Sequence, residues 1–308
     1  MSARCRRLGL FVLASVLFGG TFVAARAGLA YFPPLLFVAF RFDLAAVLLL
    51  GYVALTREHW LPRTHRDLVG VFVTGVPALG LSNALLFTGQ QYTTSAVAAV
   101  VFSLAPVLTP LFSLGLLPEE RLSARGALGL LVGLAGVGIV VRPDPGALLA
   151  GDTLGRILLL GGATSVALGS VLVRRADASL SETVTTAWGL VLGALTLHLV
   201  SAGLGESLGT VEWTPTALAS LGYLAVFAAA IAYVAYFTLL DETGPIRANL
   251  INYTIPVVTT VLGWLVLGET LAATTALGFV VIACGFVLLE YRTLAAEWSA
   301  SALGRRFE

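Results

Sequence analysis

The sequence predicts an all-α integral membrane protein with ten transmembrane helices, arranged as two inverted five-helix repeats. Three observations lead to this fold class. Of the 308 residues, 58% are hydrophobic and only 11% are charged, whereas a soluble domain carries about a quarter charged residues. Apolar runs long enough to cross a bilayer recur along the whole chain. Finally, the second half of the sequence repeats the first half.

Ten apolar runs, separated by polar residues, proline or glycine, define the expected spans. Each approaches or exceeds the length of about 20 residues that crosses roughly 30 Å of hydrocarbon. The connections between them are short, so we expect no soluble domain to be inserted. The runs cover residues 8–27, 34–55, 68–88, 93–116, 124–142, 153–173, 183–203, 215–239, 246–267 and 273–291.

The positions of the arginine residues predict the orientation of these spans. The chain has 18 arginine residues and no lysine. If the N-terminus is cytoplasmic, 14 of them lie in cytoplasmic segments, three lie outside and one lies within the membrane. Cytoplasmic loops are enriched in arginine and lysine. We therefore expect a multi-pass protein of the cell membrane with both termini in the cytoplasm.

The internal repeat is clearest around two prolines and two glutamates. Pro106 corresponds to Pro256 at an offset of 150 residues, and Glu120 corresponds to Glu269 at an offset of 149. The same spacing relates Gly20 in "FGGTFVAARA" to its counterpart in "ALGSVLVRRA". The chain therefore divides into a first repeat of five helices (1–145), a second repeat of five helices (146–292) and a short cytoplasmic tail (293–308).

Five spans per repeat is an odd number, so the second copy enters the membrane from the side opposite to the first. Inverted repeats of this kind are common in secondary transporters, in which the substrate site lies near the midplane between the halves. No cofactor or metal site is indicated. The expected partners are a small-molecule substrate and the lipid bilayer, with a homodimer left open. Nucleic acid is not expected, because the chain has no basic cluster.

The order of the motifs resembles the EamA family of the drug/metabolite transporter (DMT) superfamily. The residues that carry the resemblance are "LFGGTFVAARAG", "FVAFRFDLAAVLLL", "SLAPVLTPLFSLGLLPEERLS" and "YTIPVVTTVLGWLVLGETLA". The resemblance covers nearly the whole chain. It implies ten EamA-type helices, cytoplasmic termini, a cavity enclosed mainly by helices 1–4 and 6–9, and transport of small metabolites by alternating access. It does not name a substrate.

Two charged residues, Arg41 and Asp43, lie inside the second apolar run. A charge at the centre of a membrane helix costs roughly 2.5–3.5 kcal/mol on insertion scales, so such residues usually face the bundle interior or an aqueous cavity. Arg41 matches an arginine common at this place in the family. It is a candidate for binding an anionic group of the substrate, or else a structural arginine. Asp43 is a candidate for proton or cation coupling, although a structural, ion-paired or protonated carboxyl is the alternative.

Other polar residues share helix faces that are candidates for the wall of a substrate cavity. Helix packing by small and polar residues is the alternative interpretation for each of them. Together with Arg41, the candidate substrate-binding residues are Asn83, Gln90, Tyr233, Tyr236, Asn249 and Asn252. Glu120, Glu269, Pro106 and Pro256 recur in both copies and are assigned gating or structural roles.

The sequence favours a secondary transporter that exports or exchanges a small polar metabolite, either amino-acid-like or organic-anion-like. A channel is one alternative, and an intramembrane enzyme is another. The enzyme would need a catalytic constellation, yet His198 is the only histidine within a span and Asp43 is the only carboxylate near the bilayer centre. We therefore expect the chain not to be an enzyme.

Overall fold

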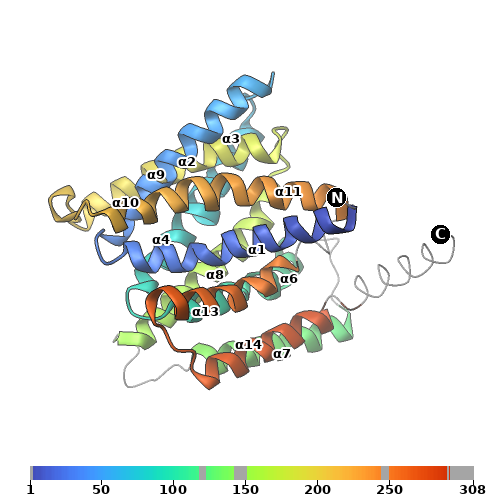
Figure 1. Cartoon of the computed structure of the whole chain (residues 1–308). Coiled ribbons are helices and arrows are strands. Elements are labelled where there is room, and N and C mark those ends of the chain that lie inside the picture. Colours follow the sequence, from blue (N-terminus) through green and yellow to red (C-terminus); the bar gives the residue numbers. More distant parts are fainter. Residues whose placement is uncertain (1–2, 118–122, 142–150, 244–249, 290, 292–308) are drawn as a thin grey trace.

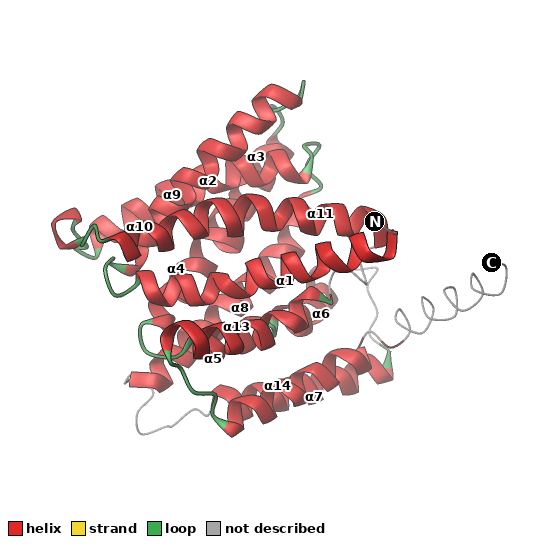
Figure 2. Ribbon diagram, viewed as in Figure 1, coloured by secondary structure: helices red, strands yellow, loops and turns green. Residues whose placement is uncertain are grey.

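The computed structural model describes residues 3–117, 123–141, 151–243, 250–289 and 291, and these residues form helices and connecting turns (Figures 1 and 2). The elements of the first half are α1 (Ala3–Gly28), α2 (Pro34–Thr56), α3 (His65–Val73), η1 (Thr74–Leu81), α4 (Ser82–Gln90), α5 (Ser95–Phe102), α6 (Ala105–Leu116) and α7 (Ala124–Val141). Those of the second half are α8 (Gly151–Ala176), α9 (Glu182–Gly203), η2 (Leu208–Thr210), α10 (Pro215–Gly222), η3 (Tyr223–Ile231), α11 (Ala232–Thr243), α13 (Ile251–Leu267) and α14 (Ala273–Leu289).

Within the described residues, eight helical segments are long and apolar enough to cross a membrane, among them the composite spans His65–Gln90 and Ser95–Leu116. The helices α13 and α14 are also apolar, and the structure describes 17 residues of each, at the lower end of the usual range for a span. The chain is thus a multi-pass helical membrane protein. Its helices are consistent with the expected two-repeat arrangement of ten spans.

Local sequence explains where several helices begin and break. Threonine side chains cap the N-termini of α3, α5 and α10, where Thr64, Thr94 and Thr214 accept hydrogen bonds from backbone N–H groups of the first turn. Such caps satisfy donors that have no partner within the helix. The expected helix over 93–116 is divided into α5 and α6 just before Pro106, because proline has no N–H to continue the ladder.

In the bundle, helices from the two halves of the chain pack on each other (Figure 1). The helix α2 lies against α9, α1 lies against α13, and α4 lies against α8. The pair α7 and α14 lies along one edge of the bundle, beyond α6 and α13, and packs mainly on itself. This is the peripheral position expected for the fifth and tenth spans.

Glycine contacts between α7 and α14 reproduce the sequence repeat in space. A Cβ atom on Gly129 would lie 2.6 Å from the carbonyl oxygen of Gly285, and a Cβ atom on Gly278 would lie 3.2 Å from that of Gly136. The offset of 149 residues converts one contact into the other, because 129 becomes 278 and 136 becomes 285. The two helices therefore approach backbone to backbone with an approximate two-fold relation, as glycine permits in membranes.

The helical bundle has two ends. The N-terminal face is the end at which α1 begins, and it also holds the contact between Arg6 and Glu242, whose Nη2 and Oε1 atoms are 2.6 Å apart. The opposite face is the end at which α1 finishes, and there Arg26 donates a hydrogen bond of 2.9 Å to the carbonyl oxygen of Gln90.

Candidate functional site

A cavity of about 770 Å³ lies between α1, α5, α6, α8, α13 and α14. Its wall extends from Phe22 and Ala99, in the middle of the bundle, to Arg174 in the last turn of α8 and Asn252 in the first turn of α13. The last two residues lie near the N-terminal face, so the cavity occupies that half of the molecule. Its polar lining residues are Ser103, Thr109, Ser113, Ser170, Arg174, Asn252 and Tyr253.

Most of the hydroxyl groups in this wall already donate to their own helices. Ser103, Thr109 and Ser170 donate to carbonyl oxygens three or four residues earlier, at 2.6–2.8 Å. Each of these hydroxyl oxygens keeps acceptor capacity for a ligand, since a hydroxyl has one donor and two acceptor positions. The guanidinium of Arg174 adds positive charge at the N-terminal end. The wall can thus receive donors along its length and an anionic group near its mouth.

A second cavity of about 290 Å³ lies beside α1, α11 and α13. It is lined by Phe18, Tyr236, Ile251, Asn252 and Ile255. Asn252 and Ile255 line both cavities. Of the predicted substrate-binding residues, Asn252 therefore lies between the two spaces, and Tyr236 lies at the smaller one.

On the opposite face, Glu269 joins the end of α13 to the beginning of α5. Both carboxylate oxygens of Glu269 accept from the backbone N–H of Ser95, at 3.1 Å each, and Oε2 also contacts the Ser95 hydroxyl. A helix N-terminus carries partial positive charge, so a carboxylate stabilises it. This contact ties the cavity-lining helices together at the end away from Arg174.

The C-terminus of α13 explains why Glu269 points toward α5. Gly268 adopts a left-handed conformation (φ +67°), and the N–H of Glu269 donates to the carbonyl oxygen of Gly263 at 3.1 Å. The N–H of Gly268 itself donates to the carbonyl oxygen of Trp264 at 3.2 Å, which is the αL type of helix C-terminus and usually has glycine at the left-handed position. Gly263 leaves the necessary space, because a Cβ there would lie 2.8 Å from both Glu269 Oε2 and Ser95 Oγ. The predicted gating or structural glutamate is thus placed between helices.

A second carboxylate on this face, Glu206, was not singled out by the sequence analysis. It accepts from the N–H groups of Leu35 and Leu36 at 3.2 and 2.9 Å, and from the hydroxyl of Ser201 at 2.7 Å. It therefore caps α2 from the loop after α9. The N-cap residue of α2 is Pro33, whose side chain cannot accept a hydrogen bond from the first turn. This feature of the sequence indicates that the free N–H groups of α2 need an acceptor from elsewhere in the chain.

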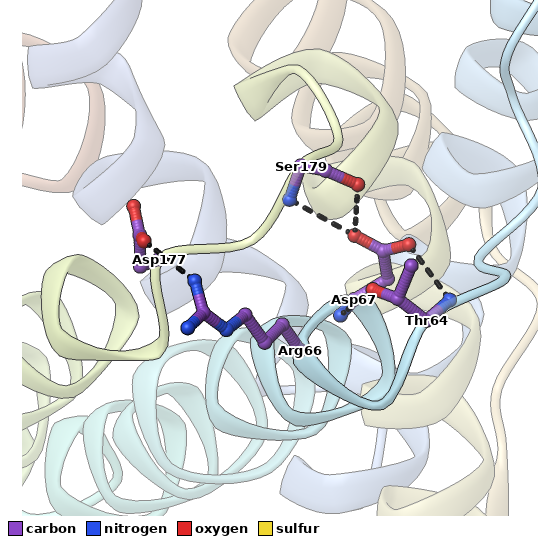
Figure 3. Close-up of polar contacts among 5 residues, drawn as sticks. All are labelled: Thr64, Arg66, Asp67, Asp177 and Ser179. Atoms are coloured by element: carbon purple, nitrogen blue, oxygen red, sulfur yellow. Dashed lines mark hydrogen bonds and ion pairs between the residues drawn. The ribbon is translucent and has the colours of Figure 1, made fainter.

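The N-terminal face has a corresponding polar cluster, drawn in Figure 3. Asp67 completes a capping box with Thr64, and its carboxylate also accepts from the backbone N–H and the hydroxyl of Ser179, at 3.0 and 2.8 Å. Beside it, Arg66 and Asp177 form an exposed ion pair of 2.9 Å. The cluster fixes the beginning of α3 to the turn between α8 and α9.

Arg41, Asn83 and Gln90 lie in contacts between helices. Arg41 Nη1 donates to Asn83 Oδ1 at 3.3 Å, and its guanidinium lies 5.9 Å from the ring centre of Phe87. Gln90 is fully buried and donates from Nε2 to the carbonyl oxygen of Phe22 at 2.8 Å. None of the three lines either cavity. Their predicted substrate contacts stay predictions.

Asp43 pairs with His198 across the α2–α9 contact. Asp43 Oδ2 and His198 Nε2 are 2.8 Å apart, and the side chains are 45% and 35% exposed. The ring of Phe40 packs 5.9 Å from the imidazole. The pair lines neither cavity. Thus Asp43 has the kind of partner expected of a structural intramembrane carboxyl, and coupling through it stays a prediction.

The remaining candidates are distributed as follows. Pro106 lines the larger cavity, and Pro256 is buried within α13. Tyr233 belongs to α11, but its side chain is outside the described part of the structure. Asn249 and Glu120 lie outside the described residues altogether.

The model of the EamA-like transporter family matches residues 7–142 and again residues 153–291. The uncharacterized inner membrane transporter YedA of Escherichia coli (strain K12) is 33% identical over 285 residues, covering 89% of this chain and 88% of that protein. The uncharacterized transporter YvbV of Bacillus subtilis (strain 168) is 28% identical over 289 residues, covering 94% and 92%.

One solved crystal structure matches the fold over 100% of both chains, with a TM-score of 0.62 and 22% sequence identity. That likeness concerns the fold alone. The family model covers most of the chain in two consecutive segments, in agreement with the motifs quoted above. The protein belongs to the EamA-like transporter family.

Proposed function

We propose that this transporter moves a small polar metabolite across the cytoplasmic membrane by alternating access, as an exporter or an exchanger. The observation that carries the proposal is the asymmetry of the bundle. A polar cavity occupies the half near the N-terminal face, while Glu269 joins α13 to α5 at the other end. A carrier in one of its two access states has this arrangement.

The arginine distribution places the N-terminal face in the cytoplasm under this proposal. The cavity would then be the inward-facing site. Release to the other side requires the contact between Glu269 and Ser95 to separate while the N-terminal half closes. Of the gating and structural roles considered for Glu269 from its recurrence in both repeats, this proposal assigns it the gating role.

The cavity wall supports an amino-acid-like or organic-anion-like substrate. Arg174 provides a cation for a carboxylate, and Asn252 provides both a donor and an acceptor at the junction of the two cavities. No Asp or Glu is among the described residues that line the larger cavity, so a cationic substrate would find no opposite charge in that part of the wall. A carboxylate-bearing metabolite is the better match.

Counterflow into proteoliposomes tests the proposal. Vesicles loaded with a mixture of amino acids and small organic acids should take up one of the radiolabelled compounds, and Asn252→Ala should reduce that uptake at least tenfold. Thr260→Ala is the matched control, because Thr260 lies on the same helix and donates within it to the carbonyl oxygen of Pro256. Equal uptake by wild-type and empty vesicles for every compound would overturn the proposal.

A further inference from the structure

Two π-helical segments interrupt the bundle at matching places. The segment η1 covers Thr74–Leu81, and η3 covers Tyr223–Ile231. Their first residues are 149 positions apart and their last residues are 150 apart, which are the offsets of the internal repeat. A π-helical stretch contains an extra residue relative to an α-helix, is rare, and is frequently found at functional sites. The presence of a π-helical segment at the same place in both repeats indicates that the two segments have the same role.

Each π segment lies against a glycine from the other half of the chain. A Cβ atom on Gly169 of α8 would lie 2.7 Å from the Cα atom of Ala78 in η1. Gly20 of α1 lies correspondingly against the hydroxyl of Tyr223, the first residue of η3. Gly20 and Gly169 are themselves related by the offset of 149. Each π segment therefore contacts a repeat-related glycine of the opposite half, although the contacting residues differ: backbone of Ala78 in η1 and the side chain of Tyr223 in η3.

The carbonyl oxygens of η1 accept hydrogen bonds from side chains, which compensate for the irregular backbone. These bonds run from Ser165 Oγ to Pro77 at 2.8 Å, from Ser82 Oγ to Ala78 at 2.5 Å, and from Asn83 Nδ2 to Leu79 at 3.0 Å. Pro77 itself has no N–H, which removes one α-helical bond and favours the wider turn. The π conformation of η1 is thus stabilised by donors from two elements, α4 and α8.

Arg41 extends this set of contacts to α2. It donates to Asn83 Oδ1 at 3.3 Å, while Asn83 Nδ2 donates onward to the carbonyl oxygen of Leu79. The amide of Asn83 is oriented by both bonds, because one uses its acceptor and the other uses its donor. Arg41 and Asn83 are therefore arranged to act on the backbone of η1.

The two α-helical parts of this span are attached to different neighbours. The carboxylate of Asp67 binds α3 to the turn before α9 through Ser179. At the other end, Gln90 binds α4 to α1 through the carbonyl oxygen of Phe22. A change in η1 would consequently move one attached group of helices relative to the other.

We propose that η1 and η3 are paired hinges of the transport cycle, and that Arg41 and Asn83 are positioning residues that hold η1 in its present conformation. The proposal rests on the proposed function. Converting a π turn into an α turn shifts the following residues by one position, which is about 100° and 1.5 Å in an α-helix. Such a shift in both repeats reorients α4 against α3 and α11 against α10, at the level of the bilayer interior.

Hydrogen exchange measured by mass spectrometry tests the hinge without a known substrate. Amides of 74–81 and 223–231 should exchange at least tenfold faster than those of the flanking α-helices. Asn83→Ala should speed exchange in 74–81 by a further tenfold or more. Asn83→Asp should do the same, because it retains an acceptor for Arg41 and loses the donor to Leu79. Thr260→Ala, which removes a comparable bond inside a regular helix, should leave 74–81 unchanged.

Deleting Ala78, or Ala229 in η3, removes the extra residue and should produce a continuous α-helix. The deleted proteins should retain helix content by circular dichroism, lose the fast exchange, and lose counterflow at least tenfold. Gly169→Ala, which crowds η1, provides a milder variant if a deletion prevents folding. Its control is Gly138→Ala, because a Cβ at Gly138 meets nothing within 4 Å.

The outcomes separate this inference from the proposed function. Counterflow in the wild-type protein together with slow, uniform exchange across both π segments would overturn the hinge. Fast exchange that responds to Asn83, together with no counterflow of any compound, would overturn the transport proposal and leave the hinge assignment standing as a conformational property. Faster exchange in 74–81 for Thr260→Ala as well would show that Asn83 has no positioning role.

Discussion

The two faces of the bundle are held by carboxylates in different ways. On the opposite face, Glu206 and Glu269 each bind the N-terminus of a helix from the first half of the chain, α2 and α5 respectively. On the N-terminal face, Asp67 binds the turn between α8 and α9. That contact lies away from α13, whose first turn borders the cavity. Under the proposed transport function, the helix ends that these carboxylates join would determine the face from which the cavity is reached.

The internal repeat shows why the two faces differ although their helices are related. Glu269 follows Gly268, whose left-handed conformation turns the carboxylate toward α5. The aligned residue before Glu120 is Glu119. A non-glycine residue adopts that conformation at a steric cost. Under the proposed transport function, this difference in sequence between the connecting residues would contribute to favouring one access state.

The largest effect is expected for Asp67→Ala on the N-terminal face. The substitution removes an acceptor of four hydrogen bonds, from Arg63 N, Thr64 N, Ser179 N and Ser179 Oγ. Hydrogen bonds to charged groups contribute about 1.5–3 kcal/mol each and are not additive, so we expect the free energy of unfolding to fall by roughly 3–5 kcal/mol. Reversible unfolding in detergent micelles measures this, and a loss below 1 kcal/mol would contradict it.

Glu269→Ala should have the next largest effect, and it should open the opposite face. Loss of the bonds to Ser95 should lower the free energy of unfolding by about 2–3 kcal/mol. The test uses a protein in which Cys5 and Cys284 are replaced by alanine and a cysteine replaces Thr109 in the cavity wall. An impermeant maleimide added at the opposite face should label this cysteine at least tenfold faster with Glu269→Ala than with Glu269 retained. Glu212→Ala, an exposed carboxylate on that face, is the control. Equal labelling in all variants would show that Glu269 does not close the cavity.

Gly263→Ala tests the space beneath this contact with a smaller perturbation. The added Cβ would crowd Glu269 Oε2 and Ser95 Oγ. Crowding costs about 1–3 kcal/mol, and alanine regains up to about 1 kcal/mol of helix propensity, so we expect a net loss near 1 kcal/mol and partial labelling of the Thr109 cysteine. Gly138→Ala gains the propensity without the crowding and should be neutral or stabilising. If both variants behave alike, the crowding argument is wrong.

The smallest effect is expected for Asp177→Asn, beside Asp67. The side chains of Arg66 and Asp177 are 69% and 81% exposed, and exposed ion pairs contribute about 0–1 kcal/mol. We expect a change below 0.5 kcal/mol that disappears in high salt. A loss as large as that of Asp67→Ala would show that the ion pair, and not the buried carboxylate, fixes this face.

Much of the fold follows from local sequence, and much of the site does not. Apolar runs, proline breaks and the glycine repeat of α7 and α14 can be read without a structure, because each depends on neighbouring residues or on the duplication. The pairing of Asp43 with His198 joins residues 155 positions apart, and no local pattern indicates it. Likewise, a charged arginine within an apolar span suggests a substrate-binding residue, yet Arg41 donates a hydrogen bond to Asn83. The π segment η1 is stabilised by donors from other elements, such as Ser165.

The backbone contact between α7 and α14 has a mechanical consequence. Gly129 and Gly285 meet with no side chain between them, so at this point no change of rotamer can let the two helices shift. Sliding by a fraction of a turn would drive Val140 and Ile282 into main-chain atoms that they already touch at Gly278 and Gly136. The helices α7 and α14 should therefore move together as one rigid body. If the two repeats tilt relative to each other, we expect the axis of that rotation to lie along the edge of the bundle formed by α7 and α14.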